Sequence, residues 1–323
     1  MRLLAAAIAF AVLTGSCVAQ LFTAAHGRAE ALRYEEAAPA TADALRRPDG
    51  LRYEYGRTQP QRAPARIISI IPAVTEMLFA IGAGPQVVGV GSFDKYPTAE
   101  VEKLPRVGAL IDPDVERILS LRPDLVVIYG SQTDLRTQLE RAKIPTYIYS
   151  HAGLADITVT IRALGARVGR EPAAGAFATA MEARIAAIRT RVAGRRRPRT
   201  LIVFERESMA LRGIYASGGI GFIHDMVEAA GGRNIFADVP RESVQASLES
   251  ILERAPEVIL ELRAPVVGRS DGWTARQVDV WRTAPSLPAV RNGRVHVLLD
   301  ERLVVPGPRV AGGVELLART IHR

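Results

Sequence analysis

The sequence predicts an α/β protein made of two Rossmann-like lobes with parallel sheets, joined through a helix. Short apolar runs alternate with helical stretches along the chain, which is typical of a parallel sheet covered on both faces. A second observation is an internal repeat: residues 116–124 (ERILSLRPD) return 133 residues later as 249–257 (ESILERAPE). A further match, 77–82 against 226–231, has an offset of 149 residues. Two copies of one fold, each with a glutamate at the same place, are suited to gripping something between them.

Length and composition fit a globular protein with two domains. The chain has 323 residues, of which 48% are hydrophobic and 24% are charged. Its formal net charge of +8 comes largely from arginines spread along the sequence, and the densest run is Arg195-Arg196-Arg197. A nucleic-acid-binding protein would more often show a basic stripe interleaved with aromatic residues, and this sequence has none. We therefore interpret the charge as solvated surface and expect no nucleic-acid partner.

The first 19 residues have the pattern of a signal peptide. Arg2 supplies a short charged region, and Leu3–Leu13 is an apolar stretch that is too short to span a membrane. Cleavage after Ala19 would leave small residues, Ala19 and Cys17, at the first and third positions before the cut, where cleavage requires them. In the alternative, Cys17 is the lipid-carrying first residue of a lipoprotein. Both alternatives imply export, and we expect a periplasmic protein.

Two further expectations concern the N-terminal part of the chain. Cys17 is the only cysteine, which excludes a disulfide, cysteine catalysis and a thiolate metal site. Residues 20–65 alternate alanine, arginine, proline and scattered acids without helical or strand periodicity, so a disordered tether is expected there.

An N-terminal α/β lobe is predicted over residues 66–152. Its first strand is Ile67–Ile71, which Pro72 ends. A helix over Thr75–Ile81 follows and ends at Gly82, a residue suited to a helix C-terminus. The other strands of this lobe are predicted at Val87–Val90, Leu125–Tyr129 and Thr146–Tyr149, and its other helices around Val115–Leu119 and Gln138–Ala142.

Two helical stretches with no strand between them mark the boundary between the lobes. Residues 153–170 are assigned as the bridging helix, and residues 171–323 as the C-terminal α/β lobe. The second stretch, 172–192, has an apolar face made of Phe177, Met181, Ile185, Ile188 and Val192. The later strands are predicted at Thr200–Phe204, Val258–Leu262 and Arg294–Leu298, and the later helices at Phe222–Ala230 and Val310–Ile321.

The order of several motifs resembles the periplasmic binding proteins of cobalamin, ferric-siderophore and haem importers. In the first half the motifs are 72–76 (PAVTE), 89–97 (GVGSFDKYP), 116–118 (ERI) and 122–124 (RPD). In the second half they are 216–219 (ASGG), 230–236 (AGGRNIF), 247–249 (SLE) and 306–309 (PGPR). The similarity covers Arg66 to the C-terminus. It implies two α/β lobes bridged by one long helix, Leu154–Val168, with the ligand in a cleft between the lobes.

The resemblance also implies a partner. One glutamate on each lobe, at Glu116 and Glu249, would dock onto arginines of an ABC transporter permease dimer in the inner membrane, and the binding protein itself is expected to be a monomer. A single exposed ion pair contributes about 0–1 kcal/mol, which suits a transient encounter. In the alternative, each glutamate only favours the start of a helix through the helix dipole.

Loops and strand ends that face the cleft in the family supply the candidate ligand contacts. The aromatic candidates are Phe93, Tyr96, Tyr129, Tyr215 and Trp273, and the basic candidates are Arg206, Arg212, Arg241 and Arg302. Aromatic faces suit a planar, partly apolar ligand, and arginines suit an anionic one. The alternatives are core packing for each aromatic residue and solvated surface for each arginine. No resident cofactor or metal site is predicted, because His151, His224 and His296 have no second ligand at metal spacing.

These observations favour a non-catalytic receptor that captures a metal chelate and delivers it to an ATP-driven importer. Cobalamin or another corrinoid is the favoured ligand, because the loop of Phe93 and Tyr96, the turn after Tyr215 and both glutamates match cobalamin-binding proteins. Some of those proteins have a tryptophan shortly before the second glutamate, where this chain has Ser243. Ferric siderophore and haem therefore stay open as ligands.

The sequence favours two other classes of function less. An exported enzyme is not expected, because no Ser/His/Asp set, carboxylate pair or nucleophile elbow stands out in the sequence. A structural or sensory domain that keeps this fold but binds no transport ligand stays open, although the presence of both glutamates favours a working permease contact.

Overall fold

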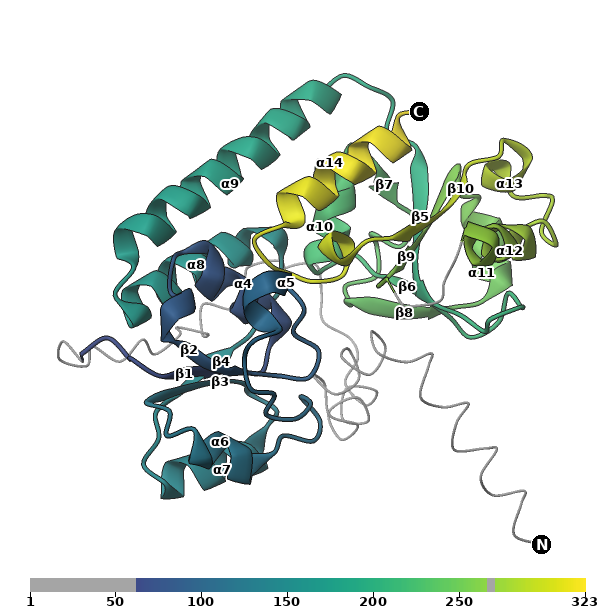
Figure 1. Cartoon of the computed structure of the whole chain (residues 1–323). Helices are drawn as coiled ribbons and strands as arrows, with labels where there is room; N and C mark the ends of the chain where they lie inside the picture. Colours follow the sequence, from purple (N-terminus) through teal and green to yellow (C-terminus); the bar gives the residue numbers. More distant parts are fainter. Residues whose placement is uncertain (1–61, 266–270) are drawn as a thin grey trace, which may run out of the picture.

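The computed structural model describes residues 62–265 and 271–323 (Figure 1). The predicted signal peptide, Cys17 and nearly all of the predicted tether lie outside these residues. Within them, no helix is both long and apolar enough to cross a lipid bilayer. The described chain forms two α/β lobes, each with its own sheet.

The N-terminal lobe is built on a four-stranded parallel sheet in the order β2-β1-β3-β4. Its strands are β1 (Ile67–Ser69), β2 (Val87–Val90), β3 (Leu125–Tyr129) and β4 (Thr146–Tyr149). Strands β1, β2 and β3 are largely buried, because helices cover the sheet, whereas the edge strand β4 is partly exposed, with Ile148 48% exposed. The helices are α4 (Pro72–Ala80), α5 (Thr98–Val101), α6 (Val115–Ser120) and α7 (Thr133–Arg141), with a 3₁₀ turn η1 (Gly84–Gln86).

The sheet of the C-terminal lobe is mixed, which corrects the prediction of a second parallel sheet. Its order is β10-β9-β5-β6-β8, with the short β7 paired to β5. Strands β5 (Arg199–Glu205), β7 (Arg233–Asn234), β9 (Val258–Arg263) and β10 (Val295–Leu299) are parallel, whereas β6 (Ile214–Ser217) and β8 (Ser243–Ala246) run antiparallel to their neighbours. Only eight residues join β5 to β6, too few for the crossover that a parallel neighbour needs.

Helices of this lobe cover both faces of the sheet. They are α10 (Phe222–Ala229), α11 (Leu248–Arg254), α12 (Asp271–Trp281), α13 (Pro288–Arg291) and α14 (Val310–Ile321), with a 3₁₀ turn η2 (Glu301–Leu303). One hydrophobic core, which contains Trp281 and Ile251, belongs to this lobe alone. A larger core extends from the N-terminal sheet through α8, α9, α10 and α14 to one face of the C-terminal sheet. The two lobes therefore share a continuous apolar interior.

The lobes are connected by two helices, α8 (Leu154–Val168) and α9 (Glu171–Val192). The segment expected to bridge the lobes alone is helical, as α8, but it forms a hairpin with α9, which the sequence analysis assigned to the C-terminal lobe. Gly165 of α8 lies against Ala174 of α9, and Arg162 pairs with Glu182. The 22-residue α9, about 33 Å long, then runs to α14 of the C-terminal lobe (Figure 1).

The internal repeat is reproduced in structural detail. β1 pairs with β3 in the same register as β5 pairs with β9. Ile67 faces Leu125 in the first lobe, and the residues 133 positions later, Thr200 and Val258, face each other in the second. In each lobe an arginine at the start of the first strand donates to the carbonyl of a residue with positive φ, which precedes a proline. These pairs are Arg66 with Arg122, and Arg199 with Ala255. The acid after each proline, Asp124 or Glu257, accepts from the backbone N–H of the same arginine.

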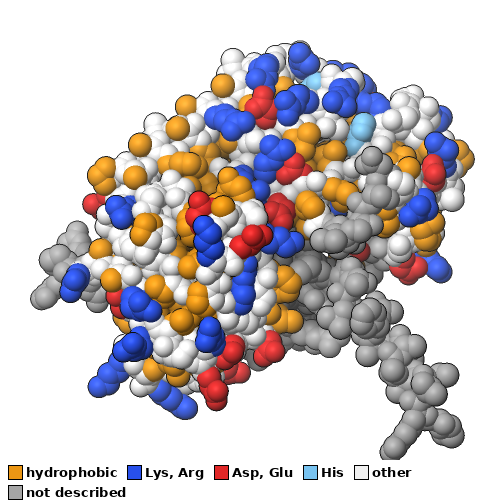
Figure 2. All heavy atoms as spheres, in the orientation of Figure 1, with side chains coloured by type: hydrophobic (Ala, Val, Ile, Leu, Met, Phe, Trp, Pro, Cys, Tyr) orange, Lys and Arg blue, Asp and Glu red, His pale blue; other side chains and the backbone are white. Residues whose placement is uncertain are grey.

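Surface charge is spread rather than concentrated. Figure 2 shows Lys and Arg side chains distributed over the face that it presents, with Asp and Glu among them. Several arginines of α9 and the following turn are paired, for example Arg184 and Arg191 with Glu315. The net positive charge thus includes many locally balanced groups.

Candidate functional site: the junction between the lobes

The two lobes meet where the strands of the N-terminal sheet end. An aromatic series crosses the junction: the Tyr129 and Tyr149 rings lie 5.4 Å apart, Tyr149 stacks on His151 at 5.8 Å, and His151 meets Phe222 edge-on at 6.0 Å. The two tyrosines end β3 and β4, whereas Phe222 begins α10 of the other lobe. Beside this series, the Leu154 N–H donates to the Asp225 carboxylate over 2.8 Å.

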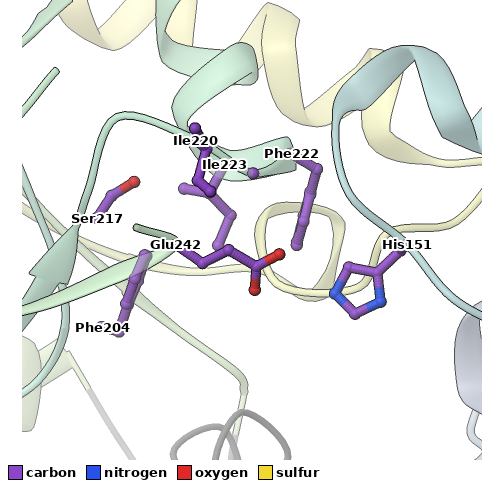
Figure 3. A pocket seen from close by; sticks show the side chains of 8 residues that line it. His151, Phe204, Ser217, Ile220, Phe222, Ile223 and Glu242 are labelled. Carbon is purple, nitrogen blue, oxygen red and sulfur yellow. The ribbon is translucent and has the colours of Figure 1, made fainter. Parts of the chain in front are cut away.

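A shallow pocket with a cavity volume of about 10 Å³ opens at this junction (Figure 3). Its lining is mostly apolar, with one carboxylate and one imidazole. The lining residues are His151, Phe204, Ser217, Ile220, Gly221, Phe222, Ile223 and Glu242. Figure 3 shows the Glu242 side chain extending toward His151, so that groups from the two lobes face the same space.

The backbone of the C-terminal lobe places Glu242 beside the end of β6. Gly218 N–H donates to the Glu242 carbonyl, and Ser217 pairs in register with Ser243 of β8. A Cβ on Gly218 would lie 2.0 Å from the Arg241 carbonyl oxygen, so only glycine permits this close approach of the two segments. The small-residue turn after β6 thus explains how Glu242 reaches the pocket.

Burial changes the ionisation of the tyrosines at the junction. It raises the pKa of Tyr129, and the negative charge of Glu242 raises that pKa further. Burial also raises the pKa of Tyr149, whose hydroxyl has no hydrogen-bond partner among the described residues. Both rings therefore stay neutral at physiological pH and present a largely apolar wall.

A buried ion pair joins the lobes at a second place. Arg309, which precedes α14, donates through Nε to Glu76 of α4 over 2.8 Å and through Nη2 to the other oxygen of the same carboxylate. Its guanidinium also lies 4.1 Å from the centre of the Tyr96 ring and 3.3 Å from a Glu301 oxygen. Burial raises the pKa of Glu76, and Arg309 partly offsets that effect. This bidentate contact ties α4 to the C-terminal lobe, and the Tyr96 ring brings the loop after β2 against the same guanidinium.

Asp94, in the same loop, is a buried carboxyl group with few partners. It is 1% exposed, and neither of its side-chain oxygens has a hydrogen-bond partner among the described residues. Burial raises the pKa of Asp94 to about 7, although the nearby Thr75 hydroxyl and Arg106 guanidinium act to lower it. Arg106 is itself held by the Asp94 backbone carbonyl at 2.6 Å.

The aromatic candidates from the sequence lie in different environments. Phe93 and Tyr215 are 40% and 42% exposed, and Tyr96 is 43% exposed beneath Arg309. Tyr129 is part of the aromatic series at the junction. Tyr215 lies within β6 rather than in a turn, and it shares the face of that strand with Ser217, which lines the pocket. Tyr129 is therefore placed at the junction, and Tyr215 beside it.

The prediction that Arg206 contacts ligand is wrong. Its side chain is completely buried and pairs with Glu261 at 2.6 Å. Its other donors reach the carbonyls of Glu207, Ser208 and Gln277. Glu261 also accepts from Trp281 at 2.6 Å, so the arginine belongs to an internal network that joins β5, β9 and α12. No sequence pattern indicated this network, because its acid, Glu261, lies inside an apolar strand run.

The other basic candidates and Trp273 are partly engaged elsewhere. Arg302 makes two-pronged hydrogen bonds to Asp300, which raises the pKa of its guanidinium, and Arg212 lies 3.4 Å from Glu207. Arg241 is exposed and adjacent to Glu242. Trp273 is half-buried in the first turn of α12, a helix that the sequence analysis did not predict. None of these four lines the pocket in the described part of the chain.

Glu116 and Glu249 occupy equivalent, exposed positions. Each is the second residue of its helix, α6 or α11, and each helix is capped by the residue two positions earlier, Asp114 or Ser247. Neither glutamate forms an ion pair within residues 62–265 and 271–323. Both carboxylates are thus available to a partner.

Sequence reasoning missed the residues that shape the junction most directly. Phe222 and Glu242 were not singled out, and His151 was considered only as a metal ligand. The Glu76–Arg309 pair is 233 residues apart in sequence, although both residues stand in motifs that carried the family resemblance. The presence of both motifs in one sequence was therefore the available signal for the Glu76–Arg309 pair. Among the described residues, no three His, Cys, Asp or Glu side chains gather to hold a metal ion.

Comparison with known proteins identifies the family. Residues 67–301 match the periplasmic binding protein family, a span that includes both lobes and the junction. The chain belongs to this family. A relative, the uncharacterized ABC transporter substrate-binding lipoprotein YvrC of Bacillus subtilis, is 28% identical over 81% of each chain.

Two solved structures extend the comparison. The vitamin B12-binding protein BtuF of Vibrio cholerae is 26% identical with a TM-score of 0.66, and the match covers 80% of this chain and 96% of that one. The haem-binding protein RhuT of Roseiflexus sp. RS-1 is 29% identical with a TM-score of 0.66, covering 80% and 97%. These relatives are binding proteins rather than enzymes.

Proposed function

We propose that this protein is the substrate-binding component of an ABC importer and that it captures a corrinoid, such as cobalamin, between its lobes. The observation that carries the proposal is the pocket at the junction, where an aromatic series from one lobe meets Phe222 and Glu242 of the other. Relatives that bind vitamin B12 or haem support the importer role. The compartment is the periplasm, in agreement with the predicted signal peptide.

The charge of the pocket favours a corrinoid over more anionic chelates. Among the described residues that line it, Glu242 is a carboxylate and none is Lys or Arg. Arg206, Arg302 and Arg309 of the C-terminal lobe are each paired with an acid. Cyanocobalamin has no net charge, whereas haem carries two propionates and catecholate siderophores are polyanions, which are best held by cationic side chains. Arg241, the exposed residue before Glu242, can pair with one anionic group of a ligand.

The size of the pocket limits how much of such a ligand it covers. Its cavity volume of about 10 Å³ lies far below the 300–1,000 Å³ typical of small-molecule sites. We infer that the pocket receives only one edge of the ligand and that the exposed side chains of Ile220 in its lining, and of Tyr215 and Phe93 outside it, contact the remainder.

A titration of the purified mature protein tests the ligand. Cyanocobalamin, haemin and a panel of ferric siderophores would be added separately, and tryptophan and tyrosine fluorescence or calorimetry would give each dissociation constant. We expect the tightest binding for cyanocobalamin and weaker binding for haemin. Preference for haemin or for a ferric siderophore would move the proposal to that ligand, and binding of none would contradict it.

Delivery to the permease is assigned to Glu116 and Glu249. Their carboxylates are exposed at equivalent places in the two lobes, so contact through both makes recognition sensitive to how the lobes are placed. Replacing both by alanine should leave ligand affinity nearly unchanged and abolish transport in a reconstituted importer. Transport by the double variant equal to that of the wild type would exclude this docking role.

A further inference from the structure

A leucine accompanies each of the two repeated glutamates. Leu119 lies three residues after Glu116 on α6, and Leu252 lies three residues after Glu249 on α11. Leu119 is 39% exposed and Leu252 is 38% exposed. Residues three apart on a helix are neighbours on its surface, so each lobe presents an acid and a leucine side by side.

The helices leave these side chains outside for a clear reason. In both helices the first and fourth residues turn inward: Ile118 and Ile251 are fully buried, and Val115 and Leu248 pack against the cores. The second and fifth residues, the glutamate and the leucine, face away. Neither leucine belongs to the two hydrophobic cores of the described chain. The exposed part of each leucine therefore lies outside both cores.

The frame around each leucine is also repeated. In both lobes the helix begins at an oxygen cap, ends before a residue with positive φ, and is tied to the first strand through an arginine and an acid. These contacts hold the two acid–leucine surfaces in the same local geometry. An isolated exposed leucine needs no explanation, but the same exposure at both repeat positions does.

We propose that Glu116 with Leu119, and Glu249 with Leu252, form two equivalent docking surfaces for a two-fold symmetric partner, the permease dimer of the importer. This inference rests on the proposed function. Two copies of one chain offer the same surface twice, which is what two equivalent docking surfaces require. Each leucine fills an apolar depression next to a basic group that receives the carboxylate, so an apolar contact supplements an ion pair that contributes little alone.

The test measures binding of the ligand-loaded protein to the permease–ATPase complex of the same organism in lipid nanodiscs. Leu119→Gln and Leu252→Gln should each weaken binding about tenfold, as expected for losing the burial of one leucine's exposed area. The double variant should weaken binding about a hundredfold, because distant sites are additive. Leu119→Met with Leu252→Met should retain binding. Val159→Gln on α8, a position 57% exposed, is the matched control and should bind as the wild type does.

Salt separates the two contributions. At high ionic strength the effect of Glu116→Gln with Glu249→Gln should shrink, whereas the effect of the leucine variants should persist. A leucine double variant that binds like the wild type would overturn the proposal, and an effect at one leucine alone would overturn the two-fold partner. Leucine-dependent self-association in light scattering would assign these surfaces to a second copy of this chain instead. Failure of the proposed function would appear separately, as wild-type protein that binds no chelate in the titration.

Discussion

Tyr215 shows how a single side chain can be placed beside the junction without supporting the fold. Its neighbours in β6, Ile214 and Ala216, are buried in the core of the C-terminal lobe, whereas Tyr215 points to the opposite face and is 42% exposed. Tyr215→Ala should therefore lower ligand affinity roughly thirtyfold, because a central aromatic contact typically contributes about 2 kcal/mol or more. Titration with cyanocobalamin measures this change.

Tyr215→Phe is the matched control for that variant. It keeps the ring and should keep most of the affinity, and both variants should melt close to the wild-type temperature. Unchanged affinity in Tyr215→Ala would remove the residue from the site, and a large loss of stability would place it in the core.

Asp94 should make stability depend on pH in an uncommon direction. Its pKa is about 7 in the folded protein and near 4 when unfolded, so the folded state binds more protons between these values. The contribution of Asp94 to the free energy of unfolding should therefore fall as pH rises from about 4 to about 7, and it should stay constant above that pH. The contribution is on the order of 2–4 kcal/mol.

Asp94→Asn isolates this contribution, because the amide has the same shape and no charge. The variant should melt several degrees higher than the wild type at pH 8 and at nearly the same temperature at pH 4.5. Thermal melts of both proteins across this range measure the difference. If the difference in melting temperature did not change with pH, folding would not raise the pKa of the Asp94 carboxyl.

At the scale of elements, sequence periodicity predicted the regular parts of the fold and missed the irregular ones. Strands β2, β3 and β4 and helix α14 coincide with the predicted ranges, because continuous apolar runs and a 3.6-residue period determine them. Strands β6 and β8 are as short as β2 and β4, but polar residues interrupt their apolar pattern. Such strands depend on pairing partners that local sequence does not encode.

The buried network around Arg206 gives the element-scale prediction. Arg206→Met leaves the Glu261 carboxylate inside the sheet without its closest cation, which should cost about 3–5 kcal/mol of stability. Arg212→Met, at an exposed position of the following loop, is the control and should change stability little. Denaturant unfolding measures both. Equal effects of the two substitutions would contradict the assigned network.

The candidate site was predictable in outline and not in its contacts. The repeat located the two glutamates proposed for docking, because a duplicated fold places duplicated residues in equivalent positions. The end of β3 supplied Tyr129, which the structure places at the junction, and the loop after β2 supplied the candidates Phe93 and Tyr96. Arg206 was misplaced because an arginine after a strand can turn either toward the junction or back under the sheet, and only the buried Glu261 decides between these.

For the whole molecule, the structure predicts little movement between the lobes. A continuous hydrophobic core, the α8–α9 hairpin and the Glu76–Arg309 pair all cross from one lobe to the other. Bending these helices would break backbone hydrogen bonds, which a hinge of extended strands would avoid. X-ray scattering profiles of the free and the cyanocobalamin-loaded protein should therefore nearly overlay. A clear decrease in the radius of gyration on loading would contradict this expectation.

The segment where the two copies of the repeat differ in length has a consequence for how the ligand preference of such binding proteins can change. Between β5 and α10 the offset grows from 133 to 149 residues, and the added segment contains β6 with Tyr215, Ser217 and the small-residue turn. The surfaces around α6 and α11 retain the common offset. Under the proposed function, ligand choice and delivery depend on separate segments, so exchanging residues 207–221 between relatives would alter one part of the ligand-binding surface and leave the permease contact unchanged.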